Sequence, residues 1–222
     1  QEHGLVDLET VAALGQGCEV LVSVCPPAAA EAVAQAALDA GFHGLFVDAN
    51  AIAPQRAQAI SEMMTAQGVT FVDGGIVGGP AWQPGKTWLY LSGPSADTAA
   101  GLFAAGPLET EVIGATVGDA SALKMCYAAY SKGTTALLAA ILATAEDLDV
   151  RSVLERQWTR DDPNFARQAQ ARTRRVTAKA WRFAGEMEEI AATFEAAGLP
   201  GGFHQAAAEV YARLNNFKGI AE

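Results

Sequence analysis

The sequence has few of the residues that cross-link small proteins or bind metals. Three cysteines, Cys18, Cys25 and Cys126, and three histidines occur among its 222 residues. The cysteine count is odd, and neither residue type shows the spacing of a metal site or of a disulfide framework. We therefore expect no metal and no disulfide, and a reducing compartment such as the cytoplasm.

Long apolar runs and basic charge are also scarce. The longest apolar run, residues 134–145, stops at Glu146 and is shorter than the ~20 residues of a membrane-spanning helix. Lys and Arg number 15 against 25 Asp and Glu, a formal net charge of -10. This acidity argues against nucleic acid and anionic membranes as partners. No secretory signal opens the sequence, and because it begins with Gln1 rather than Met, we expect the natural start to precede it.

Half of the residues are apolar, enough to bury a large core, and their order predicts an α/β first part. Continuous apolar runs at 19–25, 44–48 and 69–73 predict strands buried in a parallel sheet. Helical patterns at 9–14, 28–38 and 54–66 lie before and between them, and Pro54 suits a first helical position. Short connections between alternating strands and helices are typical of a doubly wound sheet.

The pattern changes after residue 73. A glycine-rich loop is expected at 74–80, followed by a strand at 87–91, a helix at 96–103 and a short strand at 108–113. From residue 120 onward the sequence predicts helices alone, at 120–148, 150–155, 164–179, 181–197 and 203–214. The predicted fold is therefore α/β followed by all-α, with domains at residues 1–116 and 117–222.

One lysine, Lys124, lies among small and apolar residues at the start of the helical part. A lysine is costly to bury unless it has a partner or a role, although it can also extend along the surface to reach water. In open α/β sheets, ligands bind beyond the carboxyl ends of the strands. Three such ends, at residues 25–27, 48–50 and 73–75, accompany the lysine-bearing helix, and the combination favours a functional role.

Five segments, in order, resemble those of the 6-phosphogluconate and 3-hydroxyisobutyrate dehydrogenase superfamily of β-hydroxyacid dehydrogenases. They are the strand at 20–26, the Asp-x-Ser-Thr-x-x-Pro-like segment at 46–54, the Asp-Ala-Pro-Val-Ser-Gly-Gly-like loop at 73–79, the glycine-flanked strand at 85–93 and the Gly-x-x-x-x-x-Lys at 118–124. Residues 181–190 are similar to the helical domain of a branch described as phosphogluconate dehydrogenase-like.

This resemblance implies an activity and a set of site residues. Lys124 would be the catalytic proton donor and acceptor, and NAD or NADP would be the cofactor. The partners implied are a small-molecule substrate and a second copy of the chain, in a homodimer formed through the helical domain. The cofactor would lie against Val24, Cys25, Pro26, Asn50 and Ala51, and the substrate against Val77, Gly78, Gly79 and Tyr127.

The sequence also departs from the family pattern. No Gly-x-Gly-x-x-Gly occurs in residues 1–222. The family's first strand, glycine-rich turn and helix, about 50 residues, are therefore expected to be missing, which makes the Rossmann-like sheet incomplete. Val77 stands at the serine of the substrate loop, and Ala128 at the asparagine four residues after the lysine.

These observations favour an oxidoreductase that transfers hydride to or from a small carbonyl, hydroxy-acid or imine substrate. Apolar surroundings would lower the pKa of Lys124 from about 10.4 toward neutrality. Tyr127 would hold substrate or simply pack in its helix, and Gly78 and Gly79 would offer backbone N–H groups or form a tight turn. The alternative is a noncatalytic protein that binds a cofactor or ligand for regulation.

Basic residues gather in the helical part. Arg172, Arg175, Lys179 and Arg182 are spaced by three, four and three residues and so share one helix face. Such a face is usually solvated, and the functional alternative is a clamp for a carboxylate or phosphate.

Overall fold

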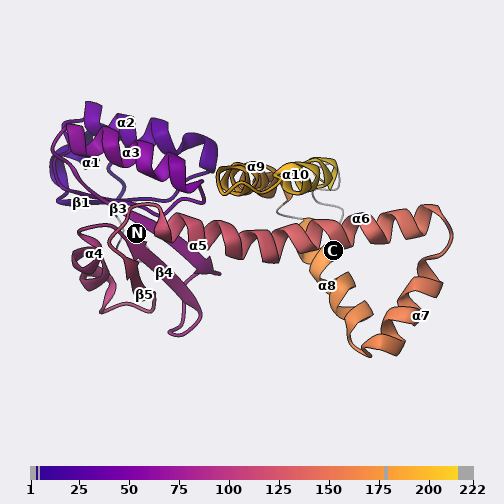
Figure 1. Cartoon of the computed structure of the whole chain (residues 1–222). Helices are drawn as coiled ribbons and strands as arrows, with labels where there is room; N and C mark the ends of the chain where they lie inside the picture. Colours follow the sequence, from indigo (N-terminus) through magenta and orange to yellow (C-terminus); the bar gives the residue numbers. More distant parts are fainter. Residues whose placement is uncertain (1–3, 5, 178–179, 215–222) are drawn as a thin grey trace. The chain divides into compact units, whose positions relative to one another are not determined.

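A computed structural model of the chain describes residues 4, 6–177 and 180–214. The chain forms two compact units, Gln1–Met125 and Cys126–Glu222. The first combines a sheet with helices and the second is helical, so the predicted fold class, α/β followed by all-α, is confirmed (Figure 1). The roles predicted for residues 1–116 and 117–222 stay predictions.

The first unit is built on a five-stranded mixed sheet in the order β1-β2-β3-β4-β5. β1, β2 and β3 pair in parallel, β3 and β4 are antiparallel, and β4 and β5 are parallel. The strands confirm the runs predicted from the sequence and span Val20–Ser23, Leu45–Asp48, Thr70–Gly78, Thr87–Ser92 and Glu109–Gly114.

Helices cover both faces of this sheet because side chains alternate along each strand. Phe46 and Phe71 point to one face, where Ile60 and other residues of α2 (Ala30–Asp39) and α3 (Pro54–Ala66) pack on them. Val47 and Val72 point to the opposite face, which α4 (Ala96–Phe103) covers. The two helices α2 and α3 lie side by side in Figure 1. A 3₁₀ turn (Pro27–Ala29) leads into α2, and α1 (Val11–Gly17) precedes β1.

The glycine-rich segment predicted as a loop at residues 74–80 is mostly strand, so that prediction was wrong. β3 continues to Gly78, and Gly74–Gly78 pair with residues 87–91 of β4. Glycine is required there by close approach rather than by a turn. A Cβ atom at Gly78, whose φ is 128°, would lie 2.6 Å from the Lys86 carbonyl oxygen. The chain turns only after Gly78.

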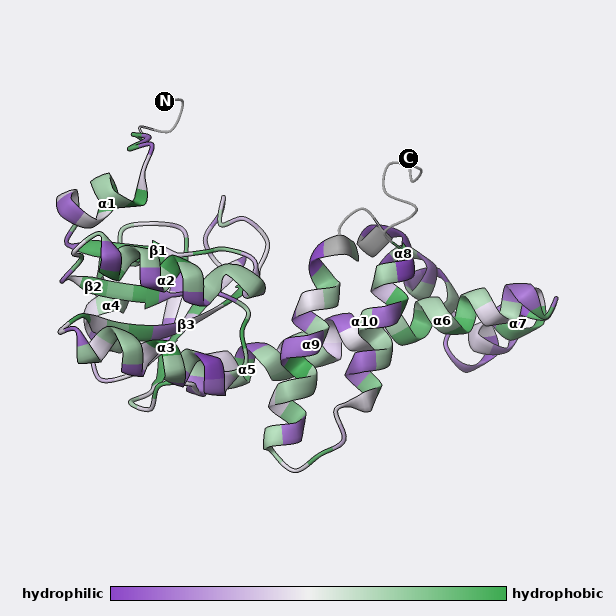
Figure 2. Cartoon of the chain, turned by 90° about the horizontal axis from the view of Figure 1, so that it is seen from above, coloured by the Kyte–Doolittle hydropathy of each residue, from purple (hydrophilic) through white to green (hydrophobic). Residues whose placement is uncertain are grey.

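The second unit consists of helices, and α5 (Asp119–Ala128) leads into it. The predicted helix at 120–148 contains a π-helical segment (Ala129–Gly133) before α6 (Thr134–Asp147). The prediction at 150–155 was too short, because α7 spans Arg151–Asp161. α8 (Phe165–Thr177), α9 (Ala180–Ala196) and α10 (Gly202–Leu214) follow, and Lys179 lies outside the described residues. Figure 2 shows that α6 is largely apolar along its length.

Side chains from neighbouring helices complete the hydrogen bonding of the π segment. A π turn disturbs the regular i→i−4 ladder and exposes carbonyl groups to other donors. The Tyr211 hydroxyl of α10 donates to the Lys132 carbonyl at 2.7 Å. The Arg172 guanidinium of α8 donates to the Ser131 carbonyl at 3.2 Å and to the Thr135 hydroxyl at 3.0 Å. Arg172 therefore joins helices within this unit, although the sequence left it open as part of a clamp.

The side chain of Lys132 is held inside the same unit. Its ammonium pairs with the carboxylate of Glu186, which is 6% exposed, and lies 4.6 Å from the centre of the Phe183 ring. Burial lowers the pKa of Lys132, and the opposing charge of Glu186 limits that shift. A lysine that is half-buried, paired and in contact with an aromatic face serves the packing of the helices.

In the part of the chain that the structure covers, no helix has both the length and the apolar character needed to cross a membrane. Among the same residues, no group of three or more His, Cys, Asp or Glu side chains is arranged to hold a metal ion.

Replacing Tyr211 with phenylalanine tests the support of the π segment. The change leaves the Lys132 carbonyl without its hydroxyl donor in a buried place, so we expect a loss of about 1–3 kcal/mol in the free energy of unfolding, measured with urea. Tyr130→Phe is the matched control, because Tyr130 is 68% exposed. Equal stability of the two variants would show that the hydroxyl of Tyr211 contributes nothing.

Candidate active site

Four polar residues form a row across the sheet. In the strand register, Ser23 of β1 lies beside Asp48 of β2, Asp48 beside Asp73 of β3, and Asp73 beside Ser92 of β4. All four are at most 5% exposed. Buried polar groups need hydrogen-bond partners, and this row obtains most of them from the segments that follow the strands.

The carboxylate of Asp73 accepts four hydrogen bonds. One oxygen accepts from the Ser92 hydroxyl at 3.0 Å, from the Gly118 backbone N–H at 2.9 Å and from the Ser121 N–H at 3.0 Å. The other accepts from the Ser121 hydroxyl at 2.6 Å. The Ser92 hydroxyl in turn accepts from the N–H of Ala120 at 3.0 Å. A carboxylate from β3 thus satisfies N–H groups at the start of α5 that have no partner within the helix.

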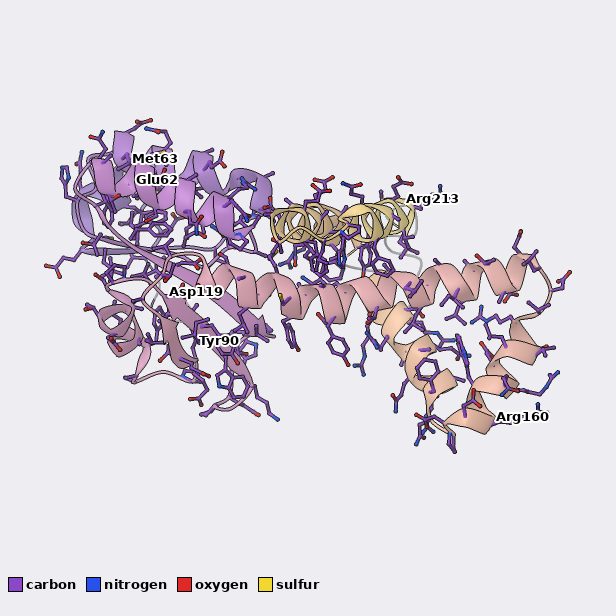
Figure 3. The ribbon with its side chains drawn as sticks, viewed as in Figure 1. Glu62, Met63, Tyr90, Asp119, Arg160 and Arg213 are labelled. Carbon is purple, nitrogen blue, oxygen red and sulfur yellow. The ribbon has the colours of Figure 1, made fainter. Side chains whose placement is uncertain are left out.

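This anchoring brings Lys124 against the same strand. Lys124 lies on α5, is half-buried, and its ammonium donates to the Ile76 carbonyl of β3 at 2.5 Å. Gly75 makes the contact possible, since a Cβ atom there would lie 2.8 Å from the Ala120 carbonyl oxygen and 3.0 Å from the Cβ of Lys124. Figure 3 shows Asp119 at the start of α5 and Tyr90, the cross-strand neighbour of Gly75, on β4.

A second cluster joins the ends of β1 and β2. The Asn50 side chain accepts from the backbone N–H of Cys25 at 2.5 Å and donates to the Ser23 hydroxyl at 2.9 Å. Asn50 is 2% exposed, so its amide ties the two strand ends together. Cys25 is half-buried, and burial raises the pKa of its thiol.

Asp48 is the least satisfied member of the row. One of its oxygens accepts from the Asn50 N–H at 2.9 Å, and the other has no hydrogen-bond partner among the described residues. Burial raises the pKa of Asp48 to about 6, the charge of Asp73 adds to the rise, and the hydrogen bonds from Asn50 oppose it. Burial therefore favours the protonated form of Asp48.

The remaining predicted cofactor residues lie at the same strand ends. Val24 is 66% exposed just beyond β1, Pro26 is also exposed, and Ala51 is half-buried after β2. With Cys25 and Asn50 they form one group at the ends of β1 and β2. Their contact with a cofactor stays a prediction.

The predicted substrate residues fall in two places. Val77, half-buried, and Gly78 and Gly79, exposed, follow Ile76 at the end of β3, close in sequence to the carbonyl that binds Lys124. Tyr127 is 48% exposed and belongs to the second unit. The structure thus brings Lys124 together with the β3 segment.

Sequence reasoning missed the residues that fix Lys124 in place. Asp73 was noted as a strand end, while Ser92 and Ser121 drew no attention as a hydrogen-bonding set. One signal was available, because Phe46-Val47-Asp48 and Phe71-Val72-Asp73 repeat the same three residues. Two neighbouring apolar runs that each place an aspartate after the same Phe-Val pair indicate buried carboxylates in need of donors.

Comparison with known proteins gives matches to a domain family and to solved structures. Residues 145–214 match the family described as a domain of unknown function, DUF1932. A conserved hypothetical protein from Sinorhizobium meliloti 1021 is 27% identical with a TM-score of 0.69, over 92% of this chain and 69% of that one. No similar sequence was found among the curated proteins.

Two further structures carry descriptive names. A conserved protein of unknown function, described as structurally similar to 3-hydroxyacid dehydrogenases, is 25% identical with a TM-score of 0.68, over 96% of this chain and 80% of that one. The 3-hydroxyisobutyrate dehydrogenase of Mycobacterium tuberculosis is 17% identical with a TM-score of 0.66, over 93% of this chain and 77% of that one. This last likeness is one of fold.

The fold is that of the 3-hydroxyacid dehydrogenases, a class of oxidoreductases. The DUF1932 match in its helical part and the likeness to these structures support the superfamily predicted from the sequence motifs, that of the 6-phosphogluconate and 3-hydroxyisobutyrate dehydrogenases.

The raised pKa of Asp48 predicts how stability depends on pH. The folded protein keeps this proton up to a pH of about 6, whereas the unfolded chain releases it near 3.8. The free energy of unfolding should therefore fall as pH rises from about 4 to 6, by up to roughly 3 kcal/mol from this group. Asp48→Asn should remove this fall in urea unfolding series at several pH values, whereas Asp97→Asn, at an exposed site, should keep it. Parallel pH profiles for wild type and Asp48→Asn would contradict the assignment.

Adding one methyl group at Gly75 tests the contact between β3 and α5. The new Cβ would clash with the Ala120 carbonyl, a backbone atom, so Gly75→Ala should lower the free energy of unfolding by about 1–3 kcal/mol. Gly101→Ala is the control, because a Cβ there meets nothing within 4 Å and alanine favours the helix. Unchanged urea stability of Gly75→Ala would show that α5 is not tightly packed there.

Proposed function

We propose that the protein is an NAD(P)-dependent oxidoreductase in which Lys124 is the general acid and base. The observation that carries the proposal is the placement of the Lys124 ammonium, 2.5 Å from the Ile76 carbonyl at the end of β3. In this class of fold, ligands bind beyond the strand ends. An amine held there by a backbone carbonyl is positioned rather than free to sample solvent.

The residues at the ends of β1 and β2 are suited to one part of the cofactor. Exposed Val24 and Pro26 offer an apolar surface, while Asn50 keeps the two strand ends together. The cofactor, when bound, supplies the hydride-transfer chemistry. A sequence for binding its pyrophosphate, Gly-x-Gly-x-x-Gly, does not occur in residues 1–222.

Lys124 would give a proton to the developing alkoxide, or take it in the reverse direction, for a small substrate next to β3. Val77 places an aliphatic side chain where the family motif has a serine, which favours a less polar carbonyl or imine over a sugar acid. The exposed glycines Gly78 and Gly79 leave the backbone open to close approach. Tyr127 as a substrate contact and the homodimer are further parts of this proposal.

A noncatalytic ligand-binding protein is the second candidate function. The observation that favours it is the loss of hydrogen-bonding groups, since Val77 and Ala128 replace the serine and asparagine of the motifs and Ala128 is 1% exposed. Two measurements on the full-length protein separate the candidates. Titration with NADH and NADPH, followed by nicotinamide fluorescence, measures cofactor binding, and a turnover assay measures catalysis. Binding without turnover of any carbonyl, hydroxy acid or imine would favour regulation.

Replacement of Lys124 by alanine tests the mechanism. We expect kcat for the best substrate of a carbonyl and imine panel to fall by about 10²–10⁴, because the proton donor is lost, while the cofactor Kd changes little. Lys86→Ala, an exposed lysine of the same unit, is the matched control and should retain turnover. Undiminished turnover of Lys124→Ala would rule out the lysine mechanism even in a true oxidoreductase.

A further inference from the structure

We propose that Asp73 is the positioning residue for Lys124, acting through the first turn of α5. The inference rests on the proposed function of Lys124, and it assigns the control of that group to a carboxylate on another element. Asp73 is 1% exposed and therefore acts on the protein rather than on a ligand in solvent.

The first step is the link between β3 and the start of α5. Four donors converge on the Asp73 carboxylate, and three of them belong to Gly118 and Ser121 at the beginning of that helix. Ser92 supplies the fourth and also accepts from the Ala120 N–H. The helix start is thus fastened to two neighbouring strands of the sheet.

The second step is the distance from this anchor to the lysine. Lys124 comes three residues after Ser121, about one helical turn, so fixing the first turn sets where the side chain leaves the helix. The lysine then reaches Ile76, three residues after Asp73 on the same strand. One strand therefore makes both contacts: Asp73 bonds to the start of the helix, and Ile76 bonds to the ammonium group of Lys124.

The third step is the close packing of α5 on β3 between the Asp73 and Ile76 contacts. Gly75 lies between Asp73 and Ile76, and its lack of a side chain lets the Ala120 carbonyl and the Lys124 Cβ approach β3. A helix start released from Asp73 would shift relative to this strand. Misplacement of a catalytic group by about 1 Å can cost on the order of 10²-fold in rate.

Asp73→Asn is the informative variant because it keeps the size of the side chain but removes its negative charge and one of its two acceptor oxygens, which weakens the bonds from Gly118 and Ser121. Asp48→Asn is the matched control. It removes a buried carboxylate from the adjacent position of the same row, and among the described residues this carboxylate bonds to Asn50 rather than to α5. Ser121→Ala is the milder variant and removes the hydroxyl that donates to Asp73.

The main readout is structural and does not require turnover. In the full-length protein, hydrogen exchange at the amides of residues 122–124 and the NMR signal of the Lys124 side chain, assigned with Lys124→Arg, report the helix start and the lysine. Asp73→Asn should speed this exchange at least tenfold and move the lysine signal toward that of an exposed lysine, with a smaller change in Ser121→Ala. Asp48→Asn should change neither.

The outcomes separate this inference from the proposed function. An unchanged Lys124 signal in Asp73→Asn would overturn the positioning role, and if that variant does not fold, an unchanged signal in Ser121→Ala would do so. Where turnover exists, Asp73→Asn should lower kcat about 10- to 100-fold with a smaller effect on KM. If the wild type neither bound a cofactor nor turned over a substrate, the oxidoreductase proposal would be wrong, and the NMR test of the positioning role would still hold.

Discussion

The hydrogen bonds to the Asp73 carboxylate are the constraint on which the candidate site depends. A buried carboxylate is costly unless donors surround it, and most of these donors lie at the start of α5. The hydrogen bonds that satisfy the Asp73 carboxylate therefore also fix the start of α5 on the sheet. In return, the N–H groups of the first turn of α5 find their acceptor on β3. Because Lys124 lies one turn later on α5, these hydrogen bonds also set its position.

The neighbouring carboxylate shows what happens without such donors. Asp48 occupies the equivalent position on the adjacent strand, ends the same Phe-Val-Asp sequence, and is equally buried. It has one backbone donor, and its pKa is raised to about 6. The same Phe-Val-Asp sequence thus has different hydrogen-bond partners on the two strands, the loop residue Asn50 for Asp48 and the distant start of α5 for Asp73.

Much of the fold was predictable from the sequence, and the site less so. The apolar runs of β1, β2 and β3 and the helices between them follow from local patterns. The extension of β3 through Gly78 did not, because five residues rich in glycine predict a loop unless the partner strand β4 is known. The π segment also escaped prediction, since Tyr211 and Arg172, far away in sequence, complete its hydrogen bonds. Lys124 was found from its motif, whereas the role of Asp73 needed the spatial meeting of residues more than 40 positions apart.

The groups that place Lys124 are distinct from the groups predicted to line the substrate. Asp73, Ser92 and Ser121 are buried and bond to one another and to the backbone, while Val77 and the glycines after it lie toward the surface at the end of β3. In the proposed site, a valine rather than a serine at position 77 would therefore offer the substrate no hydrogen bond, while the bonds that hold the lysine stay the same. An apolar lining and a firmly held lysine are therefore compatible in one site, and together they support the proposal of a less polar substrate.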